Sequence, residues 1–135
     1  MPSEIAVPVT ALYVAVAAVW LIVLTLPIVV LRQRHGVGLG AGGRADLKRA
    51  QRVHANAAEW MPLGLLLILV CELLGAPLWL LHAQGGLLVA GRGLHALGLW
   101  RSSGRSFGRA SGVLLQWAQY GLGAAGALWL ATFGG

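Results

Sequence analysis

The sequence predicts an all-α integral membrane protein, folded as a four-helix bundle whose helices run up-down-up-down. Of its 135 residues, 58% are hydrophobic and only 10% are charged, and the mean hydropathy is +0.76. This composition is not that of a water-soluble domain of the same size. A membrane-spanning helix needs about 20 largely apolar residues, so the chain has room for four such helices joined by short connections. We therefore expect one membrane domain over residues 1–135.

The positions of the basic residues predict how the bundle is oriented. The formal net charge is +6, and nine of the ten basic residues surround two connections between apolar stretches. Loops rich in Lys and Arg face the cytoplasm, so we expect both connections to be cytoplasmic and both termini to lie on the other side. Because topology accounts for this charge, we expect no nucleic-acid partner. The nine residues are Arg32, Arg34, Arg44, Lys48, Arg49, Arg52, Arg101, Arg105 and Arg109.

The first helix is predicted over residues 8–34, because the apolar run 11–31 ends at two arginines. The connection after it, 35–44, contains a Gly-x-Gly-x-Gly pattern. Phosphate-binding glycine loops follow a strand, whereas this one follows a helix, so we interpret it as a flexible loop.

The second helix is predicted over residues 45–74, with Asp46 in its first turn, where an acid complements the helix dipole. At ~1.5 Å per residue it would be ~45 Å long, which exceeds the ~30 Å hydrocarbon core. Its first turns should therefore extend beyond the lipid on the cytoplasmic side, and Glu72 should lie at the opposite interface.

The last two helices are predicted over residues 78–101 and 109–133. A Gly-Ala-Pro turn at 75–77 precedes the third helix, which is rich in glycine and carries Arg92 and His95. Small residues at helical spacing, present in both helices, allow close packing within a membrane.

A polar stripe on the second helix is the most informative feature of the chain. At about 100° per residue, Arg49, Arg52, Asn56 and Glu59 fall within an arc of about 80°, whereas His54 points away from it. Placing an ionised side chain in a bilayer is unfavourable unless an opposite charge or hydrogen-bond donors stabilise it. The cation that stabilises the Glu59 carboxylate could be Arg52 or Arg92.

The sequence allows two interpretations of this stripe. The polar residues could form an interhelical lock that holds the bundle or an oligomer in register. Alternatively, Arg52 and Arg92, with Arg105 or Arg109, could bind the carboxylates of a small ligand whose ammonium group pairs with Glu59. An arginine beside a bound thiol would also favour the thiolate, which makes thiol transfer possible.

Other site chemistries find no support in the sequence. His54 and His95 are each single on their helices, so we expect no haem. No His-Glu-x-x-His or Cys-x-x-Cys pattern occurs, so we expect no metal. The only Asp, Asp46, begins a helix and cannot complete a Ser-His-Asp triad, and the lone Cys71 is expected to be buried and inert.

Two motifs resemble the MAPEG family, the membrane-associated proteins in eicosanoid and glutathione metabolism. The first is Arg49-x-x-Arg52-x-x-x-Asn56-x-x-Glu59-x-x-Pro62 on the second helix. The second is Arg92-Gly-Leu-His95-Ala-Leu-Gly-Leu99 on the third helix, which is similar to the small bacterial members. The resemblance covers nearly the whole chain.

The resemblance implies a homotrimer, in a bacterial inner membrane, that binds glutathione near the cytoplasmic face and acts on lipophilic small molecules. The enzyme would be a glutathione transferase or peroxidase-like enzyme, with glutathione as cosubstrate; a non-catalytic trimer that binds a lipid or a partner is the alternative. Leu99 stands where several family enzymes have a tyrosine that contacts glutathione, and Trp60 stands where some have tyrosine. A missing phenol removes one hydrogen-bond donor to the ligand. The implied glutathione-binding residues are Arg49, Arg52, Asn56, Glu59, Arg92 and His95, and the implied thiol-activating residue is Arg109 or Arg105.

Overall fold

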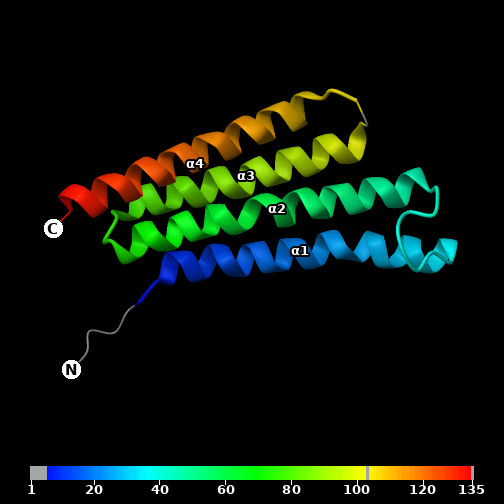
Figure 1. Ribbon diagram of the computed structural model, residues 1–135, viewed down its shortest axis with the longest axis horizontal. Coiled ribbons are helices and arrows are strands. Elements are labelled where there is room, and N and C mark those ends of the chain that lie inside the picture. The colour runs from blue at the N-terminus through cyan, green and yellow to red at the C-terminus, as the bar shows by residue number, and fades with distance from the viewer. Residues whose placement is uncertain (1–5, 103, 135) are drawn as a thin grey trace.

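The computed structural model describes residues 6–102 and 104–134, and these residues form four helices with no β-strand. Consecutive helices lie side by side and run antiparallel, so that α1 begins and α4 ends at the same end of the bundle (Figure 1). The predicted all-α architecture is confirmed. The helices are α1 (Pro8–His35), α2 (Ala45–Leu73), α3 (Leu78–Arg101) and α4 (Phe107–Phe133).

The helix ends lie within two residues of the predicted ones. The largest difference is at α4, which begins at Phe107 rather than at Arg109. Ser106 precedes the helix, and its Oγ accepts a hydrogen bond from the backbone N–H of Arg109 at 3.3 Å. This bond satisfies one of the free N–H groups of the first turn, so the helix can start earlier than the arginine.

Glycines allow α3 and α4 to approach each other closely. A Cβ added at Gly98 would lie 2.6 Å from the backbone nitrogen of Arg109, and one added at Gly112 would lie 2.6 Å from the carbonyl oxygen of Gly91. Any side chain at these positions would push the helices apart. The expected role of small residues in helix packing is therefore met at this interface.

The first helix packs mainly on α2 and makes no contact with α4 among the described residues. Its buried residues are Val9, Thr10 and Ala17, whereas most of its large apolar side chains are exposed. By length and composition, α1 and α2 could each cross a membrane. Because only 6% of the apolar stretch of α1 is buried, it does not resemble the core helix of a water-soluble protein. That α3 and α4 also span the membrane stays a prediction.

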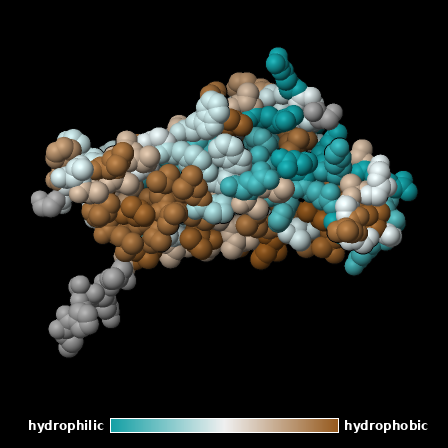
Figure 2. Space-filling view, viewed as in Figure 1, coloured by the Kyte–Doolittle hydropathy of each residue, from teal (hydrophilic) through white to brown (hydrophobic). Residues whose placement is uncertain are grey.

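One end of the bundle carries both longer loops, 36–44 and 102–106, together with the nine clustered basic residues, and we call it the basic end. Hydrophilic residues gather towards this end on the face shown in Figure 2, whereas hydrophobic residues cover much of the other half. The uneven distribution of charge predicted from the sequence is thus present in the folded chain.

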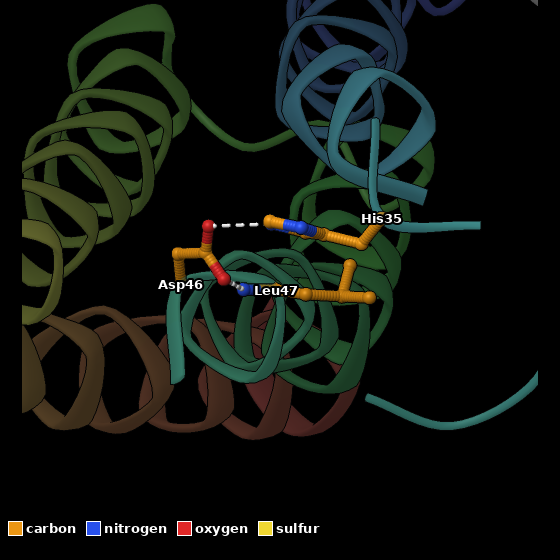
Figure 3. A network of polar contacts seen from close by, with 3 residues as sticks. All are labelled: His35, Asp46 and Leu47. Carbon is orange, nitrogen blue, oxygen red and sulfur yellow. Dashed lines mark hydrogen bonds and ion pairs between the residues drawn. The ribbon is translucent and has the colours of Figure 1, made fainter. Parts of the chain in front are cut away.

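At the basic end, polar contacts join α1 to α2. Nε2 of His35 lies 2.9 Å from Oδ2 of Asp46, whose Oδ1 accepts a hydrogen bond from the N–H of Leu47 at 2.8 Å (Figure 3). The hydrogen bond with His35 is the main cause that lowers the pKa of Asp46. The glycine loop is also tethered, since Gln51 Nε2 donates to the Gly40 carbonyl at 2.8 Å. Its path is therefore more defined than its glycine content predicts.

At the opposite end, Glu72 caps the start of α1. Its two carboxylate oxygens accept hydrogen bonds from the backbone N–H groups of Val9, at 2.9 Å, and Thr10, at 2.7 Å. A carboxylate at a helix N-terminus satisfies free N–H groups and complements the helix dipole. Since α1 starts without a side-chain cap from its own N-cap residue, Glu72 supplies the cap and joins this end of the helix to α2.

We predict that Glu72→Ala lowers the free energy of unfolding by about 1 kcal/mol, because two backbone N–H groups lose their acceptor. Glu72→Gln keeps one acceptor oxygen and should cost less. Denaturant titration of the purified protein in detergent measures both. An alanine variant as stable as the unmodified protein would contradict this role.

Candidate functional site

A buried arginine on α3 joins three helices. Arg92 is only 2% exposed, and its Nη1 donates to Oδ1 of Asn56 on α2 at 2.6 Å. Its Nη2 donates to the carbonyl oxygen of Gly112 on α4 at 3.1 Å. The guanidinium also lies over the ring of Trp60, 5.7 Å from its centroid. Both residues belong to the site that the family resemblance implies, and the structure shows a direct hydrogen bond between them.

Two aromatic side chains continue this connection between α2 and α4. The rings of Trp60 and Tyr120 stack with centroids 5.7 Å apart, and the hydroxyl of Tyr120 donates to the carbonyl oxygen of Trp60 at 2.6 Å. Tyr120 was missed by the sequence analysis, because an aromatic residue inside an apolar helix gives no sign of its partner. With its hydroxyl bonded to α2, Tyr120 acts as part of the helix interface.

Buried glutamines form a second polar group that the sequence analysis missed. Gln116 and Gln119 are fully buried, and Nε2 of Gln116 donates to Oε1 of Gln119 at 2.9 Å. Nε2 of Gln119 donates in turn to the carbonyl oxygen of Gly64 on α2 at 3.1 Å. Amides three residues apart within an apolar helix could have indicated this contact, since a buried amide needs partners.

The polar stripe of α2 divides into an inward and an outward part. Asn56 turns inward to Arg92, whereas Arg52 and Glu59 form an ion pair of 3.6 Å between Nη1 and Oε1. Both side chains of this pair are more than half exposed, at 56% and 54%. The cation that compensates Glu59 is therefore Arg52 rather than Arg92.

A cleft of about 480 Å³ opens at the basic end between α2, α3 and the start of α4, and we call it the basic cleft. Its size falls within the ~300–1,000 Å³ usual for small-ligand sites. No acidic side chain of the described residues lines it, so its surplus positive charge suits an anion. Its polar lining consists of Lys48, Arg49, Arg52, Asn56, His95 and Arg109.

Five of the eight predicted site residues line this cleft, and three do not. Arg92 lies beneath it in the interhelical network, and Glu59 is next to it through the ion pair with Arg52. Arg105 lines a neighbouring cleft instead. Leu99, the position without the family tyrosine, lies in the wall of the basic cleft and offers it no donor.

The neighbouring cleft, which we call the apolar cleft, has a volume of about 730 Å³ and lies along the first turns of α4. It shares His95 and Arg109 with the basic cleft, so these residues separate a cationic site from an apolar one. Nη1 of Arg109 donates to the Gly104 carbonyl at 2.8 Å, which steadies it at this boundary. The apolar wall is formed by Phe107, Val113, Leu114 and Trp117.

Comparison with known proteins agrees with this arrangement. A model of the MAPEG family matches residues 10–130. The chain is 38% identical over 104 residues to the inner membrane protein YecN of Escherichia coli strain K12, a match that covers 73% of this chain and 79% of YecN. The YecN protein of Escherichia coli O6:H1 is similar to the same extent. No solved structure matches the chain.

We predict that Arg92→Met lowers the free energy of unfolding by about 2 to 4 kcal/mol, because the buried oxygens of Asn56 and Gly112 lose their donors. Arg52→Gln removes an equal charge from an exposed pair and should cost at most about 1 kcal/mol. Denaturant titrations of both variants in detergent make the comparison. Equal losses in the two variants would show that Arg92 is not the structural link.

Proposed function

This chain belongs to the MAPEG family, and we propose that it is a membrane-embedded glutathione-binding protein that acts as a glutathione transferase or peroxidase-like enzyme on lipophilic electrophiles. The observation that carries the proposal is the pair of adjoining clefts, one cationic and one apolar, with Arg109 and His95 between them. A hydrophilic thiol and a lipophilic partner need such neighbouring sites.

The basic cleft has the groups that glutathione requires. Glutathione carries carboxylates at both ends, an ammonium group and a thiol, and arginines bind carboxylates through paired hydrogen bonds. Arg49 and Arg52 line the cleft on α2, and Glu59, beside Arg52, is available to an ammonium group at its edge. Because Oδ1 of Asn56 is taken by Arg92, the Asn56 amide presents its Nδ2 donor to a ligand.

The chemistry follows from the position of Arg109. A guanidinium next to the glutathione thiol stabilises the thiolate, whose proton is released to solvent. The thiolate sulfur then attacks an electrophilic carbon held in the apolar cleft, a C–S bond forms, and the leaving group departs with its electron pair. Phe107, Leu114 and Trp117 are largely exposed, so a substrate could enter this cleft from the bilayer.

The proposal includes a multi-pass protein in a bacterial inner membrane, assembled as a homotrimer, with its site facing the cytoplasm. The inner-membrane relative and the exposed apolar surface of α1 support the membrane location. The basic end supports the orientation, because Lys and Arg collect on the cytoplasmic side of membrane proteins.

A second candidate function is a non-catalytic trimer that binds a lipid or a partner, with the polar cluster as an interhelical lock. The contacts of Arg92 favour it, since they join α2, α3 and α4 without any ligand. In this case the exposed Arg52–Glu59 pair would lie at a contact between subunits.

We predict that the purified protein in detergent binds glutathione and that the bound thiol shows increased ultraviolet thiolate absorbance. Arg49→Gln should weaken binding by about tenfold, because a charge-assisted hydrogen bond is lost. Arg109→Gln should reduce the thiolate signal. Calorimetric titration and difference spectra measure the two effects.

The matched control is Arg34→Gln, since Arg34 is exposed at the same end and lines neither cleft. It should leave affinity and thiolate signal unchanged. Absence of binding by the unmodified protein at millimolar glutathione would refute the proposal.

Glu59→Gln distinguishes the two candidate functions. For a glutathione site, we predict that this variant stays trimeric but binds glutathione more weakly, because the ammonium group loses its carboxylate. Light scattering with detergent correction gives the mass, and calorimetry gives the affinity. Dissociation of the trimer, in a protein that binds no glutathione, would favour the lock.

A further inference from the structure

A second cationic cleft lies beneath the glycine loop and adjoins the basic cleft, with which it shares Ala45, Lys48 and Arg52. It has a volume of about 710 Å³ and is lined by backbone of the loop at Gly42 and Gly43 and by the first turns of α2. The loop is held over it at two points. Gln51 Nε2 donates to the Gly40 carbonyl at 2.8 Å, and Arg32 Nη1 donates to the Gly38 carbonyl at 3.0 Å. We call this site the loop cleft.

The loop cleft carries positive charge that no lining group compensates. Arg44, Lys48 and Arg52 line it and are all exposed, and none of its described lining residues is acidic. Asp46 bonds to His35 and Glu59 pairs with Arg52, so Arg44 and Lys48 are the lining cations without an ion pair among the described residues. The neutral amide of Gln51 adds a polar wall. This surplus of cations selects an anion.

Apolar surface adjoins the same loop. Leu39 is 93% exposed, next to the residues that line the cleft. On α1, Val29 and Val30 are also exposed, three and two residues before Arg32, which holds the loop. Apolar side chains directly beside a cluster of Lys and Arg are typical of the level where lipid headgroups meet acyl chains.

We propose that the loop cleft binds the phosphate group of an anionic phospholipid, such as phosphatidylglycerol, whose acyl chains lie against α1. Arg44 and Lys48 pair with the phosphate oxygens, and Arg52, which is already paired with Glu59, adds a third cation to the same wall. Free phosphate would make the same polar contacts but would gain nothing from the exposed apolar surface. The lipid therefore binds more tightly than the free anion.

This lipid site and the glutathione site can be separated by mutation. Arg44 lines only the loop cleft, whereas Arg49 and Arg109 line only the basic cleft and its apolar neighbour. Arg44 is exposed and its side chain makes no capping hydrogen bond to α2, so its replacement should not impair folding. Lys48 and Arg52 line both clefts, so Arg44 and Arg49 are the residues that distinguish the two sites.

The experiment uses the full-length protein in neutral detergent with added phosphatidylglycerol, phosphatidylcholine of the same acyl chains, or inorganic phosphate. Native mass spectrometry measures lipid adducts, and thermal unfolding measures stabilisation. We expect adducts and stabilisation with phosphatidylglycerol alone. Arg44→Gln should weaken phosphatidylglycerol binding by about fivefold, because one cation near the phosphate is lost, and Arg44→Lys should retain it.

Arg34→Gln removes one exposed arginine from the same end of the bundle but outside the cleft, so it should bind phosphatidylglycerol normally. An equal loss in Arg34→Gln and Arg44→Gln would mean unspecific attraction to the basic end and would overturn the proposal. Equal stabilisation by inorganic phosphate would overturn the lipid as the ligand. Arg49→Gln should bind phosphatidylglycerol normally, because Arg49 does not line the loop cleft. Its glutathione affinity therefore tests the glutathione site separately.

Discussion

The guanidinium of Arg92 must be paired, because an unpaired charge buried inside a bundle is strongly unfavourable. The chain supplies an amide oxygen from α2 and a carbonyl oxygen from α4 and places Trp60 against the charged plane, whereas Nε of Arg92 has no hydrogen-bond partner among the described residues. These contacts fix the three helices relative to one another at one depth. In contrast, α1 lies outside this network and is attached to α2 by polar contacts at both ends.

This pairing also decides which arginines can serve a ligand. A side chain with 2% exposure and two satisfied donors has a structural role, whereas the arginines on the rim of the basic cleft are accessible. The interhelical contacts of Arg92 and the proposed anion site, which were alternatives from the sequence, would thus be neighbouring parts of one arrangement. Arg92 orients Asn56, and Asn56 faces the cleft where glutathione is proposed to bind.

The sequence predicted the four helices well, because long apolar runs bounded by arginines and glycines leave few alternatives. It also predicted that α2 carries a polar stripe, but helical spacing alone cannot say which edge of an arc faces another helix. Asn56 therefore could not be separated from Arg52 and Glu59, although they point to different surroundings. The glutamine contacts of α4 and the stacking of Tyr120 on Trp60 depend on the register between helices. A single sequence does not contain that register.

We propose that the basic cleft between α2, α3 and the start of α4 holds an anionic thiol ligand while Arg92 keeps its structural contacts. A crystal structure of the protein grown with glutathione tests it most directly. We expect glutathione carboxylates beside Arg49 and Arg52, the thiol near Arg109, and the hydrogen bond from Arg92 to Asn56 intact. Glutathione bound away from this cleft, or an Arg92 that leaves Asn56 to bind the ligand itself, would contradict the account.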